Sequence, residues 1–598
     1  MQKMEQNRKQ VDFICYLCPV LLNRKKNEMK MKMPLVALGC LLCFTVYGQI
    51  AMNQLGFYSH APKKAAVIFT PDVTQYKIVT ETGKEVYKGK LSEPVRSKNS
   101  SLTVCQADFT QLTKPGRYRL VAGKQESGLF TVGDLVFGDV SKAVLKAFYY
   151  QRASEPLKVE HAGRWARPAG HPDTQVEIHP SAASPERPAG TIIASPGGWY
   201  DAGDYNKYIV NSGITAATLL SAYEDFPSYY RQLDVHIPET GNGIPDVLNE
   251  VLCNLRWMLT MQDPDDGGVY HKCTNASFDG MVMPGVSRDA RYAVQKSTAA
   301  ALNFTAVMAQ ASRVSGKFPN ELPGLADSCL LAAQQAWKWA LLHPDILYNQ
   351  FVMNTLFQPA ILTGEYGDFH LDDEWFWAAS EMYATTLEAR YKTKAKEYLT
   401  DKWEIPSWNQ VYMLGVYTML RIKDREFTPV FTDKLIEMAG LFAASVSTNA
   451  FGVVMGQSPA DFVWGSNAVA ANQGILLIQA YRLTDHIKYL HAALDNVDYL
   501  LGRNATGYCF VTGFGSKRVM HPHHRPSEAD GIDDPVPGLL SGGPNPGMQD
   551  GCKYPFTDPE RAFVDVMESY ASNEIAINWN APAVYLLNAV EAEKAKWR

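Results

Sequence analysis

The sequence predicts a two-domain protein: a small β-sandwich followed by a longer helical domain that closes into a barrel. Short alternating apolar runs, separated by Gly, Pro, Asp and Asn, occupy residues 50–132 and are typical of a sandwich. Helical periodicity then recurs to the end of the chain. The helices show no fixed sequence period, which argues against a stacked repeat. A chain of 598 residues also exceeds the size at which a single core usually divides.

The β-rich part contains five runs in which apolar and polar residues alternate. Turn-forming residues separate these runs, as expected for short strands joined by tight connections. We therefore expect a β-domain over residues 49–135. The runs are KAAVIFT (64–70), QYKIVTET (75–82), SLTVCQADF (101–109), GRYRLVAG (116–123) and SGLFTVG (127–133).

Eleven amphipathic runs follow, and the pattern is compatible with a twelfth. Two connections among them, 153–210 and 502–565, are far longer than ordinary loops, which rarely exceed ~12–15 residues without a function. Both are rich in polar and aromatic residues, so we expect them to form a cleft at one end of a helical barrel spanning 138–598. The helical runs are 140–152, 212–226, 244–262, 293–314, 325–342, 372–391, 407–420, 431–446, 469–483, 487–501 and 573–596.

Residues 1–48 are interpreted as an upstream extension followed by a secretory signal peptide. Two lysines precede the apolar run 34–46, and small residues ending at Gly48 offer a cleavage site. The run is too short to span a bilayer, and a buried helix or a lipoprotein cleavage before Cys40 are the alternatives. We expect export to the periplasm, the cell surface or the exterior. The signal would be terminal if translation began at Met29, Met31 or Met33.

Composition excludes several classes of protein. The net charge of −5 gives no basic surface for nucleic acid or anionic lipid, and no later segment has ~18 uninterrupted apolar residues. Of 10 cysteines, the six beyond residue 48 are scattered without CxxC spacing, so neither a dense disulfide framework nor a cysteine zinc site is expected. The 30 Tyr, 25 Phe and 12 Trp are the distinctive feature, because aromatic rings pack in cores but also stack on sugar faces. We expect a monomer.

The stretch GGWYDAGDYNKY (197–208) places Asp201 and Asp204 close together between aromatic residues. An EF-hand loop would need oxygen ligands at its first, third and fifth positions, and counting from Asp201 gives Asp, Gly and Tyr, so that reading fails. The pair lies too far upstream to cap the helix expected from Ser212. A functional role for the pair therefore depends on a partner carboxyl elsewhere in the chain.

Glu574 supplies such a partner. It is followed by Ile575, Ala576 and Ile577 in what reads as a largely buried helix. Burial disfavours the charged form of a carboxyl and raises its pKa, which is what a general acid near neutral pH requires. The alternative is a Glu paired with Arg or Lys across the core.

A third polar segment, GFGSKRVMHPHHRPS (513–527), contains three histidines. They could suggest a metal, but Arg and Lys residues lie among them and no Cys or carboxylate completes a tetrahedral set. We interpret the His and Arg side chains as hydrogen-bond donors to a neutral, hydroxylated ligand.

With these motifs together, the chain resembles glycoside hydrolase family 9, whose members are largely cellulases. GGWYDAGDYNKY, HPHHRPS with PVPGLLSGGPNPG, and FVDVMESYASNEIAINWNA match the landmarks of that family, and AMNQLGFYSHAPKKAAVIF resembles the immunoglobulin-like domain that precedes the catalytic domain in one branch. The resemblance implies an immunoglobulin-like sandwich followed by an (α/α)6 barrel. It also implies inverting endo-hydrolysis of β-1,4-glucosidic bonds in cellulose or related plant β-glucans.

The resemblance also implies roles for individual residues. Asp204 matches the general base that activates water, Asp201 the aspartate that helps to hold that water, and Glu574 the general acid. An inverting glycosidase needs this arrangement of an acid and a base on opposite faces of the bond. His523 and Arg525 match residues that contact sugar near the cleaved bond.

Four further positions follow from the resemblance. Asp565 matches a supporting acid, and Trp464 is expected to stack on sugar. Trp579 stands where an aromatic residue, often tyrosine, is usual, and Tyr205 stands where histidine is frequent; we expect both to contribute to sugar binding. The segment 160–181 lacks the Cys/His pattern that binds zinc in some relatives, so no zinc is predicted. No cofactor is needed for the chemistry, but structural calcium is possible, with Asp373 a candidate ligand.

Two other functions remain open at this point. An exo-acting glycosidase, such as a β-glucosidase, cellodextrinase or exo-glucosaminidase, would use the same scaffold with one end of the groove closed, and the insertion 171–191 could form that wall. An inactive carbohydrate-binding protein would keep the rings but lose Glu574 or the aspartates, all of which are present.

Overall fold

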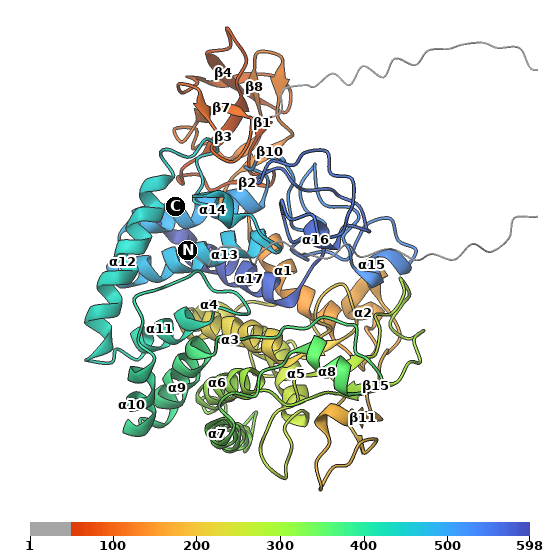
Figure 1. The fold of residues 1–598 in the computed structure, drawn as a ribbon. Coiled ribbons are helices and arrows are strands. Elements are labelled where there is room, and N and C mark those ends of the chain that lie inside the picture. The colour runs from red at the N-terminus through yellow and green to blue at the C-terminus, as the bar shows by residue number, and fades with distance from the viewer. Residues whose placement is uncertain (1–49, 598) are drawn as a thin grey trace, which may run out of the picture. The chain divides into compact units, whose positions relative to one another are not determined.

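A computed structural model describes residues 50–597 and confirms the fold class: a β-sandwich followed by a barrel of helices (Figure 1). The extension and signal peptide predicted over 1–48 lie outside the described residues. No helix within 50–597 has both the length and the apolar character needed to cross a bilayer.

Two sheets form the N-terminal domain. One has the strand order β1-β3-β7-β6 and the other β2-β10-β8-β4-β5, with β9 on β8. Between them, Phe57 meets Phe109 and Phe130 edge to face, with ring centroids 5.2 and 5.7 Å apart. The strands are β1 (Ile50–Ala51), β2 (Gly56–Phe57), β3 (Lys64–Ile68), β4 (Gln75–Thr80), β5 (Glu85–Lys90), β6 (Val95–Arg96), β7 (Thr103–Asp108), β8 (Gly116–Ala122), β9 (Gln125–Glu126) and β10 (Phe130–Val132).

The helices that follow close into a ring. Contacts run from α3 through α6 and α9 to α11, and from α3 through α17 to α13, while α12 bridges α11 and α13 and α1, α5, α7, α10 and α14 pack against these helices. The residues of α3, α6, α13 and α17 are almost all buried, whereas α12 buries only four of its residues. The helices are α1 (Gly138–Gln151), α3 (Ile209–Asp225), α5 (Asp246–Thr260), α6 (Thr298–Ser315), α7 (Leu325–Leu342), α9 (Asp372–Thr386), α10 (Ala389–Glu397), α11 (Tyr412–Arg421), α12 (Phe427–Ser445), α13 (Ser466–Thr484), α14 (Ile487–Leu500) and α17 (Ile577–Ala592).

One helix predicted from the sequence is two helices in the structure. The run 372–391 breaks at Leu387, whose φ of 59° lies in the left-handed region and ends α9. The chain then starts again as α10, which supplies the twelfth helix. Shorter helices lie in the connections: α2 (Val159–Ala162), α4 (Pro227–Tyr230), α8 (Gln350–Leu356), α15 (Arg525–Ala529) and α16 (Tyr570–Asn573).

The long connection 153–210 contributes to a small third sheet beside the barrel. Its strand order is β12-β11-β15-β14-β13, so the sheet joins this connection to the one that follows α5. The strand β13 comes directly after the Asp201–Asp204 loop and runs into α3, which anchors the C-terminal end of that loop. The strands are β11 (Val176–Ile178), β12 (Ile192–Ile193), β13 (Lys207–Tyr208), β14 (Lys272–Asn275) and β15 (Arg291–Ala293).

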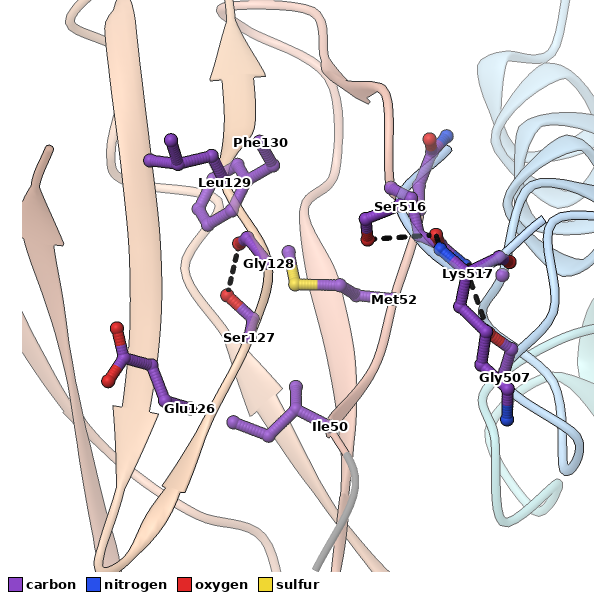
Figure 2. Close-up of a pocket in the computed structure, with 13 residues that line it drawn as sticks. Ile50, Met52, Glu126, Ser127, Gly128, Leu129, Phe130, Gly507, Ser516 and Lys517 are labelled. Carbon is purple, nitrogen blue, oxygen red and sulfur yellow. Dashed lines mark hydrogen bonds between the residues drawn. The ribbon is translucent and has the colours of Figure 1, made fainter. Parts of the chain in front are cut away.

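Polar side chains join the sandwich to the barrel. Asn53 Nδ2 donates to Asp498 Oδ1 at 2.7 Å, and Gln54 bridges to Gly507 O at 2.9 Å and to the backbone N of Lys517 at 2.8 Å. A cavity of about 360 Å³ lies at this junction (Figure 2). It is lined by Met52 and residues 126–130 on one side and by Gly507, Ser516 and Lys517 on the other, and none of the predicted catalytic carboxyls reaches it.

Candidate active site

Backbone pairing brings the three sequence motifs together. Ala202 forms an antiparallel bridge with Ala576, and His523 forms a parallel bridge with Glu574. The backbone N of Ile577 donates to Asp201 O at 2.8 Å. Segments that lie more than 300 residues apart in the sequence are therefore held side by side by their main chains.

Gly203 is the point of closest approach between two of these segments. A Cβ atom at this position would lie 2.1 Å from His523 O, a distance that no side chain can accommodate. The backbone N of Arg525 donates to Gly203 O at 3.2 Å, and its Nη1 donates to the same oxygen at 2.7 Å. The glycine of DAGD thus lets the histidine loop lie directly on the aspartate loop.

Asp201 is buried, and each of its carboxyl oxygens accepts one hydrogen bond. Asn211 Nδ2 donates to Oδ1 at 2.5 Å and Tyr366 Oη donates to Oδ2 at 2.7 Å. Burial and the negative charge of Asp204 raise the pKa of Asp201, and these two hydrogen bonds oppose that rise. The orientation of this carboxyl is fixed by residues of α3 and of the segment before α9.

Asp204 is held through one oxygen only. Asn206 Nδ2 and Tyr208 Oη donate to Oδ2, at 2.5 and 3.2 Å. Within the part of the chain that the structure describes, no group donates to Oδ1. One face of this carboxylate is therefore free to accept a proton from a water molecule.

Glu574 does not lie in a helix, contrary to the prediction from its apolar neighbours. It follows α16 with φ −68° and ψ 161°, in an extended stretch that pairs with the two other motifs before α17 begins. The stretch reads as helical because its residues are buried against loops, not against a helix partner. Burial, followed by the charges of Asp204 and Asp201, raises the pKa of Glu574 well above its ordinary value, against a smaller opposing effect of Arg525.

Asp565 holds the histidine loop in place. Its carboxylate accepts hydrogen bonds from the backbone N of Met520 and of His521, each at 2.9 Å, and from Asn573 Nδ2 at 3.0 Å. These bonds connect the loop before His523 with the residue before Glu574. Asp565 therefore positions both segments and has no free face of its own.

His523 and Arg525 project from this loop. His523 Nδ1 donates to Met567 O at 2.7 Å, and burial lowers the pKa of the ring, so the neutral form has Nε2 free. Arg525 donates from Nε and Nη2 to Asp279 O, at 3.0 and 2.9 Å, and Phe278 lies 5.7 Å from the guanidinium carbon. The guanidinium is thus oriented by backbone oxygens and leaves its charge unpaired.

Two of the predicted aromatic residues lie on the same side of the site. Trp464 is 42% exposed and its ring lies 5.5 Å from Tyr570, which in turn lies 6.0 Å from His523. Trp579 is half-buried against Gly465, the residue after Trp464, where a Cβ atom would come within 2.4 Å of its Nε1. Trp464 presents an accessible ring and Trp579 supports the backbone behind it.

Tyr205 lies in a different environment from the one expected for a sugar contact. Its ring is 1% exposed, packs 4.8 Å from Tyr200, and its hydroxyl donates to Val282 O at 2.6 Å. Trp199 is also fully buried, against Phe148 at 4.7 Å. The rings around the two aspartates stiffen the loop from behind and leave no ring face for a ligand.

Several residues of the site were not identified from the sequence. Asn206, Tyr208 and Asn211 all lie within ten residues of Asp201, so their proximity in the sequence was an available signal. Tyr366 had none, because it lies far along the chain and reaches Asp201 only through the fold. Trp408 packs edge to face on Tyr366 at 5.3 Å and extends the aromatic lining on that side.

Within residues 50–597, no group of three or more His, Cys, Asp and Glu side chains is placed so that it could hold a metal ion. Asp373, the calcium ligand suggested by the sequence, starts α9 next to Glu374. Both carboxylate oxygens of Glu374 and Oδ2 of Asp368 are buried without a hydrogen-bond donor. Buried oxygen atoms without a hydrogen-bond donor are suitable ligands for a Ca²⁺ ion whose other ligands are backbone oxygens and water molecules.

A barrel of helices with an acid and two aspartates converging on one site defines a glycoside hydrolase of the two-carboxyl type. The sequence model described as "Glycosyl hydrolase family 9" matches residues 137–587, and that described as "Cellulase N-terminal ig-like domain" matches 46–127. The chain belongs to glycoside hydrolase family 9.

Similar proteins agree with this assignment. A xyloglucan-specific endo-β-1,4-glucanase of Bacteroides ovatus is 46% identical over 551 residues, covering 91% of this chain and 94% of the relative. Endoglucanase D of Acetivibrio thermocellus is 31% identical, covering 90% and 83%. The solved structure of a family 9 glycoside hydrolase from Bacteroides ovatus superimposes with a TM-score of 0.87 at 44% identity, covering 91% of this chain and 99% of that one. The chain is thus an enzyme of the endo-β-1,4-glucanase type, with the predicted immunoglobulin-like and (α/α)6 architecture.

Proposed function

We propose that the enzyme hydrolyses β-1,4-glucosidic bonds with inversion, with Glu574 as general acid and Asp204 as general base. The observation that carries this assignment is the contrast between the two carboxyls. Glu574 is kept protonated by burial and by two neighbouring carboxyls, whereas Asp204 leaves Oδ1 free of protein donors. An inverting glycosidase needs one carboxyl of each kind.

In this mechanism the two aspartates share one water molecule. Asp204 Oδ1 accepts its proton as it attacks, while Asp201, held by Asn211 and Tyr366, fixes its position. Glu574 protonates the leaving oxygen on the opposite side of the bond. His523 Nε2 and the unpaired charge of Arg525 orient the hydroxyl groups of the sugar next to the bond, and Trp464 offers a face for a neighbouring sugar.

Proton NMR of the first product tests the stereochemistry. Hydrolysis of a β-linked oligosaccharide should release the α-anomer first, before mutarotation mixes the two forms. An initial β-anomer, or a glycosyl group trapped on Asp204, would show a retaining reaction and would contradict the assignment of Asp204 as base.

As substrate we propose a plant β-glucan with xyloglucan as the preferred polymer. The support is the 46% identity over nearly full length to the xyloglucan-specific relative. Activity should be compared on xyloglucan, carboxymethylcellulose, mixed-linkage glucan and chitosan, together with the product lengths from cellohexaose. Faster release of single terminal units than of internal fragments would favour the exo-acting alternative.

We propose that a structural calcium ion binds at the start of α9 next to Asp373, where Glu374 and Asp368 offer buried oxygens and where backbone oxygens and water complete the ligand set. Burial, together with the charges of Asp373 and Asp368, raises the pKa of Glu374 well above its ordinary value, so three carboxyls are gathered with too few donors. Binding of Ca²⁺ would relieve this repulsion and stabilise the start of α9. Isothermal titration of the EDTA-treated protein with Ca²⁺, and its melting temperature with and without the ion, test this; absence of heat and of any shift would contradict it, and Glu374→Gln is the matched variant.

We further propose that the enzyme acts as an exported monomer. The signal-like run before Gly48 supports the export. Fractionation of the producing cells and sedimentation of the purified enzyme test it, and retention in the cytoplasm or a stable dimer would contradict it.

A further inference from the structure

Lys272, the first residue of β14, is a fully buried cation with neutral partners. Its Nζ donates to Gln350 Oε1 at 2.6 Å, to Gly364 O at 2.6 Å and to Thr363 Oγ1 at 3.1 Å. No carboxylate within residues 50–597 lies within 4.0 Å of it, whereas the equally buried Lys207 pairs with Asp173 at 2.7 Å. Burial of a cation without a counter-ion is costly, so its position requires an explanation.

The hydrogen bonds of Lys272 lead to the two aspartates of the site. They hold the segment 363–366, in which the backbone N of Gly364 donates to Tyr208 Oη at 3.1 Å. Tyr208 Oη in turn donates to Asp204 Oδ2 at 3.2 Å. Two residues further on, Tyr366 Oη donates to Asp201 Oδ2 at 2.7 Å. One short segment therefore contacts Asp201 directly and Asp204 through Tyr208, and Lys272 is one of the residues that anchor it.

The side chain of Lys272 also lies beside the strand that follows the aspartate loop. Lys272 lies opposite Tyr208 in the β13–β14 pair, and its Nζ is 5.4 Å from the centre of that ring. Burial lowers the pKa of Lys272 to about 7, against smaller opposing effects of the negative charges of Asp204 and Glu365. The other titratable groups around it are Tyr208 on β13, Tyr348 before α8, His271 next to it in the chain and His179.

We propose that Lys272 is a positioning residue of the hydrolysis: its three hydrogen bonds hold the segment 363–366, which contacts Asp201 through Tyr366 and Asp204 through Tyr208. This inference rests on the proposed roles of the two aspartates at the attacking water. It assigns to a residue outside the reacting groups the task of keeping both carboxyls in place.

The test compares Lys272→Met with Lys63→Met. Lys63 is a matched control in the sandwich, because it is buried and donates only to the carbonyl oxygens of Ser59, Ala61 and Thr110. We expect Lys272→Met to lower kcat by ~10-fold with KM nearly unchanged, since the two carboxyls lose their alignment while the sugar-binding side chains stay in place. Lys63→Met should lower the melting temperature and leave kcat unchanged.

A second variant keeps the test decisive if Lys272→Met does not fold. Gln350→Leu keeps the lysine but removes one of the three acceptors of its Nζ and the hydrogen bond from Gln350 to Thr363 O, so it should lower kcat in the same way by a smaller factor. A folded Lys272→Met or Gln350→Leu enzyme with the wild-type kcat would overturn the inference. Asp204→Asn separates the two levels: if that variant stays active, the base assignment fails and the inference with it, whereas an inactive Asp204→Asn beside an unchanged Lys272→Met overturns the role of Lys272 alone.

Discussion

The two ends of helix α3 carry buried pairs of carboxyl groups with opposite properties. Asp201 and Asp204 lie in the loop that leads into its start, and Glu224 and Asp225 lie in its last turn. Arg313 pairs with Glu224 at 2.9 Å and Arg421 with Asp225 at 3.0 Å. Among the described residues, no Lys or Arg side chain comes within 4.0 Å of the carboxyl groups at the other end.

The difference shows in the pKa values. Burial alone would raise the pKa of Glu224 and of Asp225, but the arginines outweigh it and lower both to about 2. Asp201 is equally buried, has an acidic neighbour in place of a cation, and its pKa is raised. Burial therefore does not decide what a carboxyl can do in this barrel. The presence or absence of an arginine separates a structural charge from a reactive group.

The largest expected effect concerns the catalytic carboxyls, which form no ion pair within residues 50–597. Glu574→Gln should lower kcat on an unactivated glucan by ~10²–10⁴-fold, because the amide has nearly the same shape but cannot donate the proton. Its melting temperature should stay close to that of the wild type, since no ion pair is broken. Turnover near the wild-type rate would remove Glu574 from the reaction; steady-state kinetics and calorimetry provide both measurements.

The two aspartates should differ from each other. Asp204→Asn removes the group that takes the proton from water, and Asp201→Asn only loosens the position of that water, so the first should lose ~10-fold or more activity beyond the second. Kinetics on the same oligosaccharide check the order. If the order is reversed, the two roles are exchanged while the site remains.

For Glu224 and Asp225, which form ion pairs at the end of α3, we expect substitution to lower stability without lowering activity. Glu224→Gln removes one of the two carboxylates that each of Arg313 and Arg421 contacts, and should lower the free energy of unfolding by about 1–3 kcal/mol with kcat of the folded enzyme unchanged. The wild type loses the same contribution as the pH falls below the ordinary pKa of a Glu towards about 2, because its folded-state pKa is depressed. Urea unfolding between pH 7 and pH 3 measures both; a stable but inactive Glu224→Gln would contradict the comparison.

The smallest effect concerns the alkaline limb of the pH profile. The negative charge of Asp201 favours the protonated form of Glu574, so removing it in Asp201→Asn should lower the pKa of the acid. The residual activity should then fall at a lower pH than in the wild type. A limb that stays in place, measured on kcat/KM at constant ionic strength, would show that Asp201 does not act on Glu574.

The sequence was informative where chemistry is local in the chain. The spacing of Asp201 and Asp204, the buried setting of Glu574 and the alternation of 50–132 each follow from residues a few positions apart. Glu574 was assigned to a helix because apolar residues on all sides fit a buried helix and a buried loop equally well. Tyr366 and Lys272 could not be found, because their contacts with the aspartates span long sequence separations and depend on loops packing together. The helical periodicity predicts how many helices there are but not how they are arranged. The specific (α/α)6 arrangement therefore followed from the resemblance to the family.

The main-chain pairing of Ala202 with Ala576 has a consequence for enzyme engineering. Because hydrogen bonds between backbones fix the two loops, the gap between acid and base can be adjusted only through the length of the side chains that project into it. Asp204→Glu would fill the space of the attacking water by one methylene while the loops stay where they are. The length of the side chain at position 204 can therefore be changed on its own to redesign the stereochemistry of bond cleavage.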